Sequence, residues 1–470
     1  MPTVNITATL SGQKIKLGAN VIGYHLAKVF RDDFFNSVGQ CFDLDQAGQA
    51  LVRSLPGNCV RFPAGTAGID AAFNPGSTDG GHQYGVNSTS PTPGVNKDNS
   101  ESTNFHLDAM QFVLSSRKTR MVYMHNRYQD TADLLAFLQA MAAQGTPIKE
   151  IELGNEVYLS KGAALFPTWQ PYEDWANAQM SSVRAVYPKM RFSIPIPRSE
   201  DMQARPAAWR AALIAAVQAG TIAPDALSPH IYGFIDAAAY TDGSLTAAGA
   251  AAWIGTVNEY DWLNNGVVAT YGPLGLPFWL TEYSLNGGSG EGEDEGGSEL
   301  TTHLSALWTA ERVLAYRLLN MDLPKVRGVN QFEFTHYQTL AGVPGRLIYP
   351  NGDTFATSGN YYSIWQHREL ENGRGIHLQH NIAPELLQMG CFTNWLFSYI
   401  FYVNKTSNTG QLAIEAPGYW QRHSFTGMAS GNAALLADTQ YNVDNSTQIE
   451  PYSFGYFKCL NRRNPLTFTP

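Results

Sequence analysis

Two glutamates stand at the ends of apolar segments of this chain. Glu156 closes the segment KEIELGNE (149–156), and Glu282 lies in LPFWLTEYS (276–284). Two carboxyl groups about 5–5.5 Å apart can hydrolyse a glycosidic bond with retention of configuration, because one attacks the anomeric carbon while the other protonates the leaving oxygen and later activates water. A single glutamate in such a place is usually solvated or salt-bridged, so the hypothesis depends on the pair.

Further polar residues stand near the ends of other apolar segments. If these segments are strands of one parallel barrel, their carboxyl ends meet at one face, where barrel enzymes have their active sites. For His125 and His230 a purely structural role stays open. The segment 325–337 contributes three more polar residues, Gln331, Glu333 and His336. We expect the substrate to be bound by Arg61, His125, Asn126, Asn155, His230 and Tyr232.

The segments that must position these residues alternate between short apolar runs and alanine-rich amphipathic stretches. Such alternation is typical of a parallel sheet wound with helices, and eight β/α units in order are what a (β/α)8 barrel requires. We therefore predict an α/β fold, a (β/α)8 TIM barrel over residues 18–372. Its strands are predicted at 19–25, 58–65, 119–126, 149–156, 190–197, 225–233, 276–284 and 325–337.

The two ends of the chain show a different pattern. Residues 1–17 alternate between apolar and polar around Ser11-Gly12, which predicts a β-hairpin. Within residues 373–470 the helical period fades, and segments such as LFSYIFYV and FGYFKCL are separated by turns. We predict that residues 373–470 form a small β-sandwich domain, which the N-terminal hairpin joins.

The motifs GNE and WLTEY, on predicted strands four and seven, resemble those of clan A retaining glycoside hydrolases. Within that clan, ELGNE is similar to the heparanase and β-glucuronidase-like branch and to the arabinofuranosidase-like branch. The resemblance implies that Glu156 is the acid/base and Glu282 the nucleophile. It also implies that Asn155 binds the sugar 2-hydroxyl. Tyr232 would donate a hydrogen bond to Glu282 and Arg61 would add positive charge beside it.

Some stretches depart from that resemblance or add to it. RFPAGT (61–66) resembles the Arg-Phe/Tyr-Gly-Gly-Thr turn of the branch but has Pro63-Ala64 in its middle. Phe332 and Phe334 lie where clan members often have Trp. The polar stretch 70–104 is expected to wall the cleft, and the acidic stretch 287–299 is expected to form a solvated lid rather than a calcium loop, since it lacks the EF-hand order of ligands.

Composition limits the partners of the protein. The net charge of −9 makes nucleic acid and anionic membranes poor partners, while a carbohydrate substrate fits an aromatic content of 12%. The four cysteines, Cys41, Cys59, Cys391 and Cys459, have no zinc-site spacing, so we expect no metal and no cofactor. No run of 18 apolar residues occurs, so no transmembrane helix is expected. The sequence leaves the oligomeric state open.

The sequence leaves alternatives open for the cellular location and the substrate specificity of the protein. The N-terminal segment MPTVNITATLSG has no signal-peptide pattern, so an intracellular protein, a removed leader and another export route all stay open. We expect an extracellular or periplasmic protein. The main hypothesis is a retaining glycoside hydrolase acting on a poly- or oligosaccharide. A uronic-acid or galactan-type endohydrolase and an arabinofuranosidase are both open. The alternative from another class is a non-catalytic carbohydrate-binding or structural protein on a barrel scaffold.

Overall fold

The computed structural model of the protein describes residues 3–16, 22–25, 50–51, 53–57, 59–62, 71–73, 82–84, 120–125, 131–143, 145, 147–198, 202–234, 237–241, 244–286, 303–322, 326–328, 348–351, 354–357, 359–370, 373–413, 420–426 and 448–460. Several residues singled out in the sequence lie outside these ranges, so what was predicted of them stays a prediction. They are Cys41, Pro63-Ala64, most of 70–104, Asn126, 287–299, Gln331, Phe332, Glu333, Phe334 and His336.

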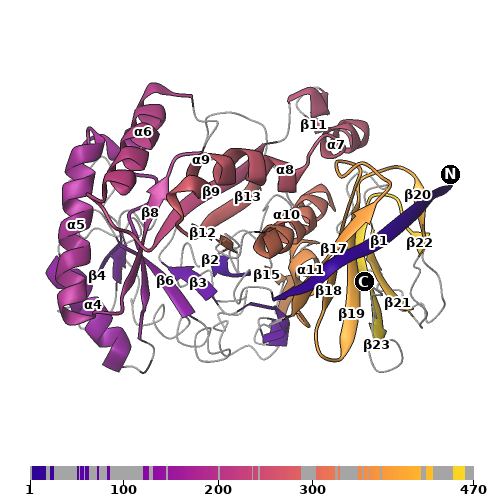
Figure 1. Ribbon diagram of the computed structural model, residues 1–470, viewed down its shortest axis with the longest axis horizontal. Coiled ribbons are helices and arrows are strands. Elements are labelled where there is room, and N and C mark those ends of the chain that lie inside the picture. Colours follow the sequence, from indigo (N-terminus) through magenta and orange to yellow (C-terminus); the bar gives the residue numbers. More distant parts are fainter. Residues whose placement is uncertain are drawn as a thin grey trace.

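Eight strand positions follow one another in one parallel sheet (Figure 1). Every pairing between neighbours is parallel, and the spatial order is the chain order. Each predicted strand overlaps an observed one, so the predicted β/α order is confirmed as a sheet running from β2 to β14. The strands are β2 (Tyr24–His25), β3 (Cys59–Phe62), β6 (Arg120–His125), β7 (Glu150–Leu153), β8 (Arg191–Ile196), β9 (Ala226–Phe234), β12 (Phe278–Leu280) with its continuation β13 (Glu282–Asn286), and β14 (Val326–Gly328).

Helices follow the strands along the chain and pack on the outer side of this sheet. They are α4 (Thr131–Ala143), α5 (Trp169–Val186), α6 (Ala204–Ala219), α7 (Ala247–Ile254), α8 (Glu259–Leu263), α9 (Ala269–Tyr271), α10 (His303–Asp322) and α11 (Gly359–Trp365). The ends follow local chemistry: α6 stops at Gly220, whose φ is 73°, and the Thr246 hydroxyl caps α7. None of the helices among the described residues is both long and apolar enough to cross a lipid bilayer.

Shorter elements connect these helices and strands. Single helical turns are η2 (Ser160–Gly162), η3 (Ala237–Ala239) and η5 (Gly272–Leu274), and η4 (Asn264–Val268) is a π-helical turn. Two-stranded antiparallel pairs are β4 (Ala71–Phe73) with β5 (His82–Tyr84), β10 (Tyr240–Thr241) with β11 (Ser244–Leu245), and β15 (Ile348–Asn351) with β16 (Thr354–Thr357).

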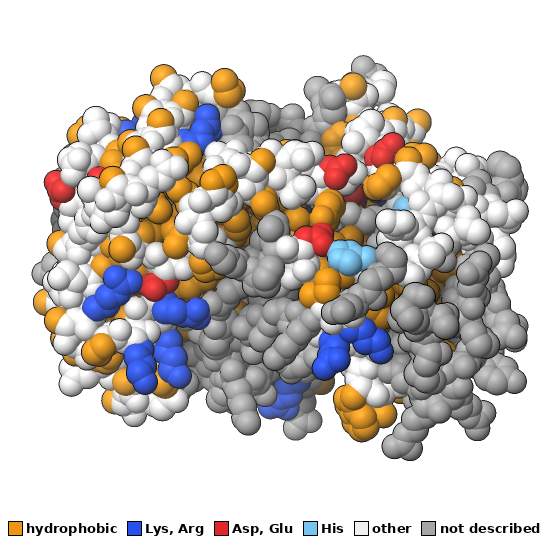
Figure 2. Space-filling model, viewed as in Figure 1, with side chains coloured by type: hydrophobic (Ala, Val, Ile, Leu, Met, Phe, Trp, Pro, Cys, Tyr) orange, Lys and Arg blue, Asp and Glu red, His pale blue; other side chains and the backbone are white. Residues whose placement is uncertain are grey.

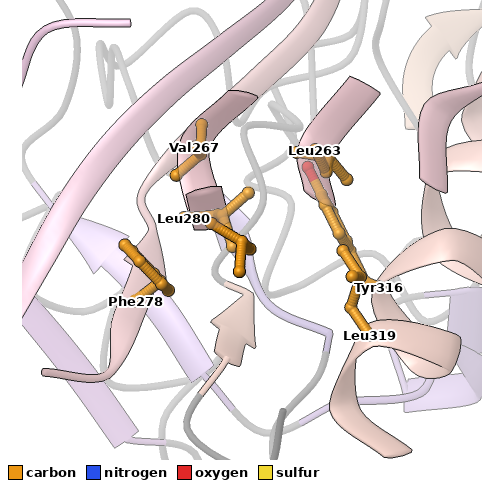
Figure 3. A pocket seen from close by; sticks show the side chains of 7 residues that line it. Leu263, Val267, Phe278, Leu280, Tyr316 and Leu319 are labelled. Atoms are coloured by element: carbon orange, nitrogen blue, oxygen red, sulfur yellow. The ribbon is translucent and has the colours of Figure 1, made fainter. Parts of the chain in front are cut away.

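A small apolar cavity lies between β12, α10 and the turn η4 (Figure 3). It measures about 10 Å³ and is lined by Leu263, Val267, Val268, Phe278, Leu280, Tyr316 and Leu319. A space of this size holds at most one water molecule, and its apolar lining offers that water few partners. We interpret it as a packing gap beside the wide π-helical turn rather than as a ligand site.

The β-rich module is one eight-stranded sheet in the order β21-β23-β19-β18-β17-β1-β20-β22. The N-terminal segment joins this module as predicted, but as one strand and not as a hairpin. Residues 3–7 of β1 pair with β20, and residues 8–11 and 15–16 pair with β17, with a shift of register between Ser11 and Ile15. Long-range partners thus supply the hydrogen bonds that a hairpin would make locally. Its strands are β1 (Thr3–Lys16), β17 (Arg374–His380), β18 (Leu387–Thr393), β19 (Phe397–Asn404), β20 (Thr409–Ala413), β21 (Trp420–Phe425), β22 (Gln448–Ile449) and β23 (Ser453–Leu460).

Both faces of this sheet are buried. On one face Phe401 and Tyr456 pack with Leu314 of α10, which lies between the barrel strands and the module in Figure 1. On the other face Ile400 packs in one cluster with Leu412 of β20, so the β20–β22 edge covers the middle of the sheet. The predicted β-sandwich is supported in part, as one sheet with a covering edge. The domain boundaries at 17/18 and 372/373 stay predictions.

Candidate active site

The end of β7 is a strained turn that carries Asn155 and Glu156. Gly154 has a φ of 86°, and Glu156 has a φ of 44°, which is uncommon for a residue with a side chain. A Cβ on Gly154 would lie 2.8 Å from Val157 Cγ1. The Gly154 N–H donates to the carbonyl of His125, 3.0 Å away on the neighbouring strand β6. Backbone strain of this kind concentrates at functional sites, where the surrounding structure imposes it.

Glu282 reaches the interior through a shift in strand pairing. Phe278 of β12 pairs with Leu227, whereas Glu282 of β13 pairs with His230, so one extra residue lies between the two pairings. Side chains alternate along a strand, and an extra residue reverses which face each one takes. Thr281 and Glu282 therefore both contact buried residues on the inner face of the sheet, Glu152 and Arg61, although they are consecutive.

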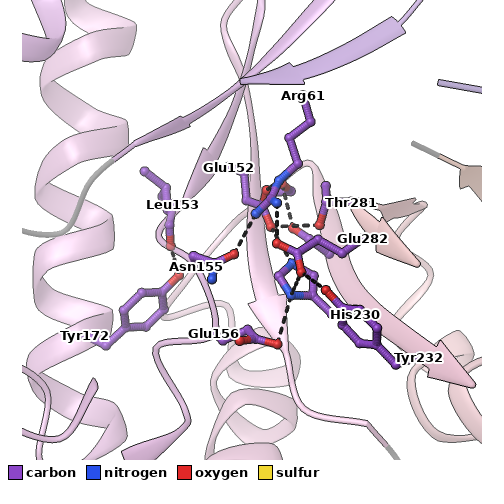
Figure 4. A network of polar contacts seen from close by, with 12 residues as sticks. Arg61, Glu152, Leu153, Asn155, Glu156, Tyr172, His230, Tyr232, Thr281 and Glu282 are labelled. Carbon is purple, nitrogen blue, oxygen red and sulfur yellow. Dashed lines mark hydrogen bonds and ion pairs between the residues drawn. The ribbon is translucent and has the colours of Figure 1, made fainter. Parts of the chain in front are cut away.

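Arg61 of β3 is the centre of a buried polar network (Figure 4). Its Nε donates to Glu152 Oε2 at 2.5 Å and its Nη1 to Glu282 Oε1 at 2.5 Å. Its Nη2 donates to Asn155 Oδ1 at 2.9 Å. A buried guanidinium is tolerated only when its donors are satisfied by charged or polar partners. Arg61 thus fixes two carboxylates and one amide, which come from β7 with its following turn and from β13.

The two candidate catalytic carboxylates face each other across His230. His230 Nδ1 lies 3.2 Å from Glu156 Oε1 and 3.3 Å from Glu282 Oε2. One carboxylate oxygen of Glu156, one of Glu282 and a ring nitrogen of His230 all lie within 4.8 Å of one another. The phenol of Tyr232 donates to Glu282 Oε2. Glu282 is 3% exposed and Glu156 is 16% exposed, so the two glutamates have different surroundings.

Charges in this network stabilise one another. Burial lowers the pKa of His230, but the charge of Glu282 and the contacts with Glu152 and Glu156 outweigh it and raise the pKa to about 9. Burial likewise raises the pKa of Glu152, but Arg61 and His230 bring it below its ordinary value. Burial and the charge of Glu282 hold the pKa of Tyr232 well above its ordinary value. At neutral pH His230 is therefore a cation and Tyr232 a hydrogen-bond donor.

Two residues of the network, Glu152 and Thr281, were missed by the sequence analysis. Glu152 is buried in β7 and accepts hydrogen bonds from Arg61 and from the Thr281 hydroxyl, the latter at 2.8 Å. His230 Nε2 lies 3.4 Å from the same carboxylate. The signal was available, because an acidic residue inside a buried apolar strand, as Glu152 is in β7, needs a buried cationic partner.

The structure brings most of the predicted residues together, with one exception among those described. Arg61, His230 and Tyr232 each contact Glu282. His230 also contacts Glu156, and Asn155 is bound by Arg61. His125 is buried at the end of β6, where its ring stacks on Trp175 of α5 at 5.6 Å between centroids. Tyr123, two residues earlier, packs on Phe137 of α4, so this face of β6 is turned toward the helices. This geometry gives no support to a substrate-binding role for His125.

The cluster of Glu156, His230 and Glu282 has the spacing of a metal site. Its chemistry favours a proton network instead. Arg61, a permanent cation, already binds one oxygen of Glu282, and the Tyr232 phenol donates to the other, so both oxygens of this carboxylate already have hydrogen-bond donors.

The fold is shared with solved glycoside hydrolases. The structure is similar to a family 51 α-L-arabinofuranosidase from Bifidobacterium longum, with a TM-score of 0.70 at 12% identity over 98% of this chain and 100% of that one. A GH51 arabinofuranosidase from Xanthomonas axonopodis pv. citri gives 0.65 at 12% identity over 97% and 100%. The catalytic domain of GH30 xylanase C from Talaromyces cellulolyticus gives 0.53 at 12% identity over 97% and 99%. No protein-family model matches the sequence, and comparison with curated protein sequences gives no match.

Proposed function

We propose that this protein is a retaining glycoside hydrolase that cleaves a poly- or oligosaccharide by double displacement. The observation that carries the proposal is the pair of carboxylates, which approach within 4.8 Å just beyond the carboxyl ends of β7 and β12. An inverting enzyme needs a wider gap, of about 6.5–9.5 Å, to hold a water between its carboxyl groups. The shared fold with glycoside hydrolases supports the same reaction class.

In the first step Glu282 attacks the anomeric carbon and Glu156 gives a proton to the leaving oxygen. Glu282 suits the nucleophile because Arg61 and Tyr232 hold its two oxygens, one each, and fix its orientation. Glu156 suits the acid because it is the more exposed of the two, so that a leaving group and later a water can reach it.

In the second step Glu156 takes a proton from water, which attacks the glycosyl-enzyme and releases Glu282. Asn155 accepts from Arg61 through its carbonyl oxygen, so its amide N–H groups are the end that can donate to a sugar hydroxyl. A hydrogen bond to the 2-hydroxyl strengthens in the transition state. Arg61 therefore orients both the nucleophile and the residue that holds the sugar.

Among substrates, an arabinofuranoside is the candidate favoured by a specific observation. The two arabinofuranosidases fit this fold with TM-scores of 0.70 and 0.65, above the 0.53 of the xylanase. A uronic-acid or galactan-type endohydrolase is the competing proposal. Polysaccharides of either kind are degraded outside the cytoplasm, so we propose an extracellular or periplasmic location. On the face drawn in Figure 2, the Lys and Arg side chains of the described residues stand in several small, separate groups, so these residues form no continuous basic groove for a polyanion on this face.

Hydrolysis assays on a panel of aryl glycosides and polysaccharides test the proposal. Aryl glycosides, including arabinofuranosides, and a set of polysaccharides are incubated with the wild type and with Glu282→Gln, which keeps side-chain size but cannot attack. We expect turnover by the wild type only, with the anomeric configuration retained in the first product seen by NMR. Binding of glycans without turnover by either protein would support the non-catalytic alternative, and an inverted first product would contradict the double displacement.

A further inference from the structure

A buried tryptophan packs directly behind the proposed nucleophile and its phenol donor. Trp308 of α10 is fully buried. A Cβ placed on Gly233 would lie 2.7 Å from its Cε2 and Nε1 atoms, so the indole lies flush against the β9 backbone. Gly233 follows Tyr232 in the chain. The same ring lies 6.2 Å from the ring of Tyr283, which follows Glu282.

The two strands touched by Trp308 are neighbours. β9 and β13 pair in parallel, with Leu285 opposite Gly233. Because side chains alternate, Gly233 and Tyr283 lie on the outer face of this pair, while Tyr232 and Glu282 project to the inner face. Trp308 therefore supports, from the outside, the two backbones whose spacing sets the contact between Tyr232 and Glu282.

The indole is itself fixed in place. Its Nε1 donates to Glu259 Oε1 at 2.8 Å. The other oxygen of Glu259 binds Arg312 Nη2 at 2.5 Å, and the guanidinium of Arg312 stacks 4.5 Å from the Trp308 ring centroid. All three side chains are buried. A ring held at its N–H and on one face cannot tilt to make room without breaking the hydrogen bond to Glu259, which would leave a buried carboxylate oxygen without its donor and is costly.

We propose that Trp308 is a positioning residue for the reaction: clamped by Glu259 and Arg312, it holds β9 and β13 so that the Tyr232 phenol stays on the Glu282 carboxylate. The inference deepens the proposed function and depends on it. Trp308 touches neither substrate nor reacting atoms. It acts through Gly233 and Tyr283, and a misplacement of about 1 Å at a reacting centre can cost on the order of 100-fold in rate.

Trp308→Phe tests the inference because it keeps an aromatic ring but removes the atoms nearest Gly233 and the N–H held by Glu259. We expect kcat on an aryl glycoside to fall about 10- to 100-fold while KM changes less than about threefold. A merely structural role would lower the amount of folded enzyme but leave the kcat per folded molecule unchanged, so a fall in kcat without a matching change in KM distinguishes positioning from structural support.

Trp169→Phe is the matched control. Trp169 of α5 is also buried and its Nε1 also donates to a glutamate, Glu173 Oε2, at 2.7 Å. Its ring packs on Tyr172 and Trp209, among helices α5 and α6, rather than on β9 or β13. We expect a similar loss of thermal stability and an unchanged kcat.

Gly233→Ala approaches the same contact from the strand and serves if Trp308→Phe does not fold. Its methyl group collides with the indole, so we expect a fall in kcat of similar size. In the double variant the smaller phenyl ring leaves room for the methyl group, and kcat should exceed the value expected if the two losses simply multiplied. Losses that multiply, or a Trp308→Phe enzyme with kcat within about twofold of the wild type, would overturn the inference.

If the wild type hydrolyses no glycoside, the proposed function is refuted, and the contact between Tyr232 and Glu282 must be tested directly. Crystal structures of the wild type and of Trp308→Phe then decide it. The Tyr232 hydroxyl should lie within hydrogen-bond distance of Glu282 in the wild type and move away in the variant. An identical contact in both structures would refute the role of Trp308.

Discussion

Removing the hydroxyl of Tyr232 should slow the release of Glu282 from the glycosyl-enzyme. The phenol donates to Glu282 Oε2, and its pKa is held far above neutrality, so it is a donor at any working pH. Glu282 leaves as a carboxylate in the second step, and this hydrogen bond stabilises the charge that appears on it. The bond also forms while Glu282 is a free nucleophile, so Tyr232→Phe affects mainly the step that regenerates it.

The size of the effect follows from the contacts of Glu282. A hydrogen bond to a charged group contributes about 1.5–3 kcal/mol, which corresponds to roughly a 10- to 150-fold change in rate. Arg61 still holds Oε1, and His230 Nδ1 remains 3.3 Å from Oε2, so the carboxylate keeps partners and the fold should be retained. We therefore expect kcat on an activated aryl glycoside to fall about 10- to 150-fold.

The assay is pre-steady-state release of the aryl group, followed by steady-state turnover. Tyr232→Phe should show a burst of about one aryl group per enzyme, because the glycosyl-enzyme then accumulates. Tyr399→Phe is the control, since Tyr399 of β19, in the β-rich module, also donates to a carboxylate, that of Glu369 in the segment after α11. A kcat within about twofold of the wild type would show that the phenol does not stabilise Glu282. A loss of kcat without a burst would place the effect in the first step and refute the reasoning.

Three further outcomes follow from the same network. Glu156→Ala should retain activity best on substrates with good leaving groups, and azide should restore turnover as a glycosyl azide of retained configuration; failure of azide to restore any turnover would count against Glu156 as the acid/base. Arg61→Met should lower the free energy of unfolding by about 3–5 kcal/mol, since it leaves Glu152 buried without its guanidinium; a loss below about 1 kcal/mol in urea titrations would mean that the pair is not buried as described. His230 has a folded pKa of about 9, raised from 6.5, so the stability it contributes is complete below about pH 6.5 and is lost as pH rises to about 9. His230→Gln should flatten unfolding free energy against pH in that window, and an unchanged slope would show that His230 is not charged.

The sequence predicted the parallel order of strands because each apolar run was flanked by an amphipathic helix, and the order alone places Glu156 and Glu282 at one end of the sheet. It could not predict that Glu282 faces inward. Strict alternation from Trp279, which lies in the buried cluster with Cys59 and Val122, would place Glu282 on the outer face. The extra residue in the pairing with β9 reverses this.

Long-range contacts explain the other differences. The Ser11-Gly12 pattern favours a local turn, but residues 3–16 form one strand because β17 and β20, about 360 or more positions away in the chain, supply its partners. The pairing with β17 shifts in register between Ser11 and Ile15. Glu152 was overlooked because its partners, Arg61 and Thr281, come from distant strands. His125 was assigned to the pocket from its position at a strand end, whereas the face of β6 on which it lies is turned to Trp175.

The most direct test of the account is to trap the covalent intermediate. A 2-fluoro glycoside of the sugar that the wild type hydrolyses slows both steps, and a good leaving group lets the first step proceed, so the glycosyl-enzyme accumulates. Peptide mass spectrometry should find one sugar attached to Glu282, and Glu282→Gln should take up none. A label on Glu333 or on any residue other than Glu282, or time-dependent turnover with inversion and no label, would contradict the account.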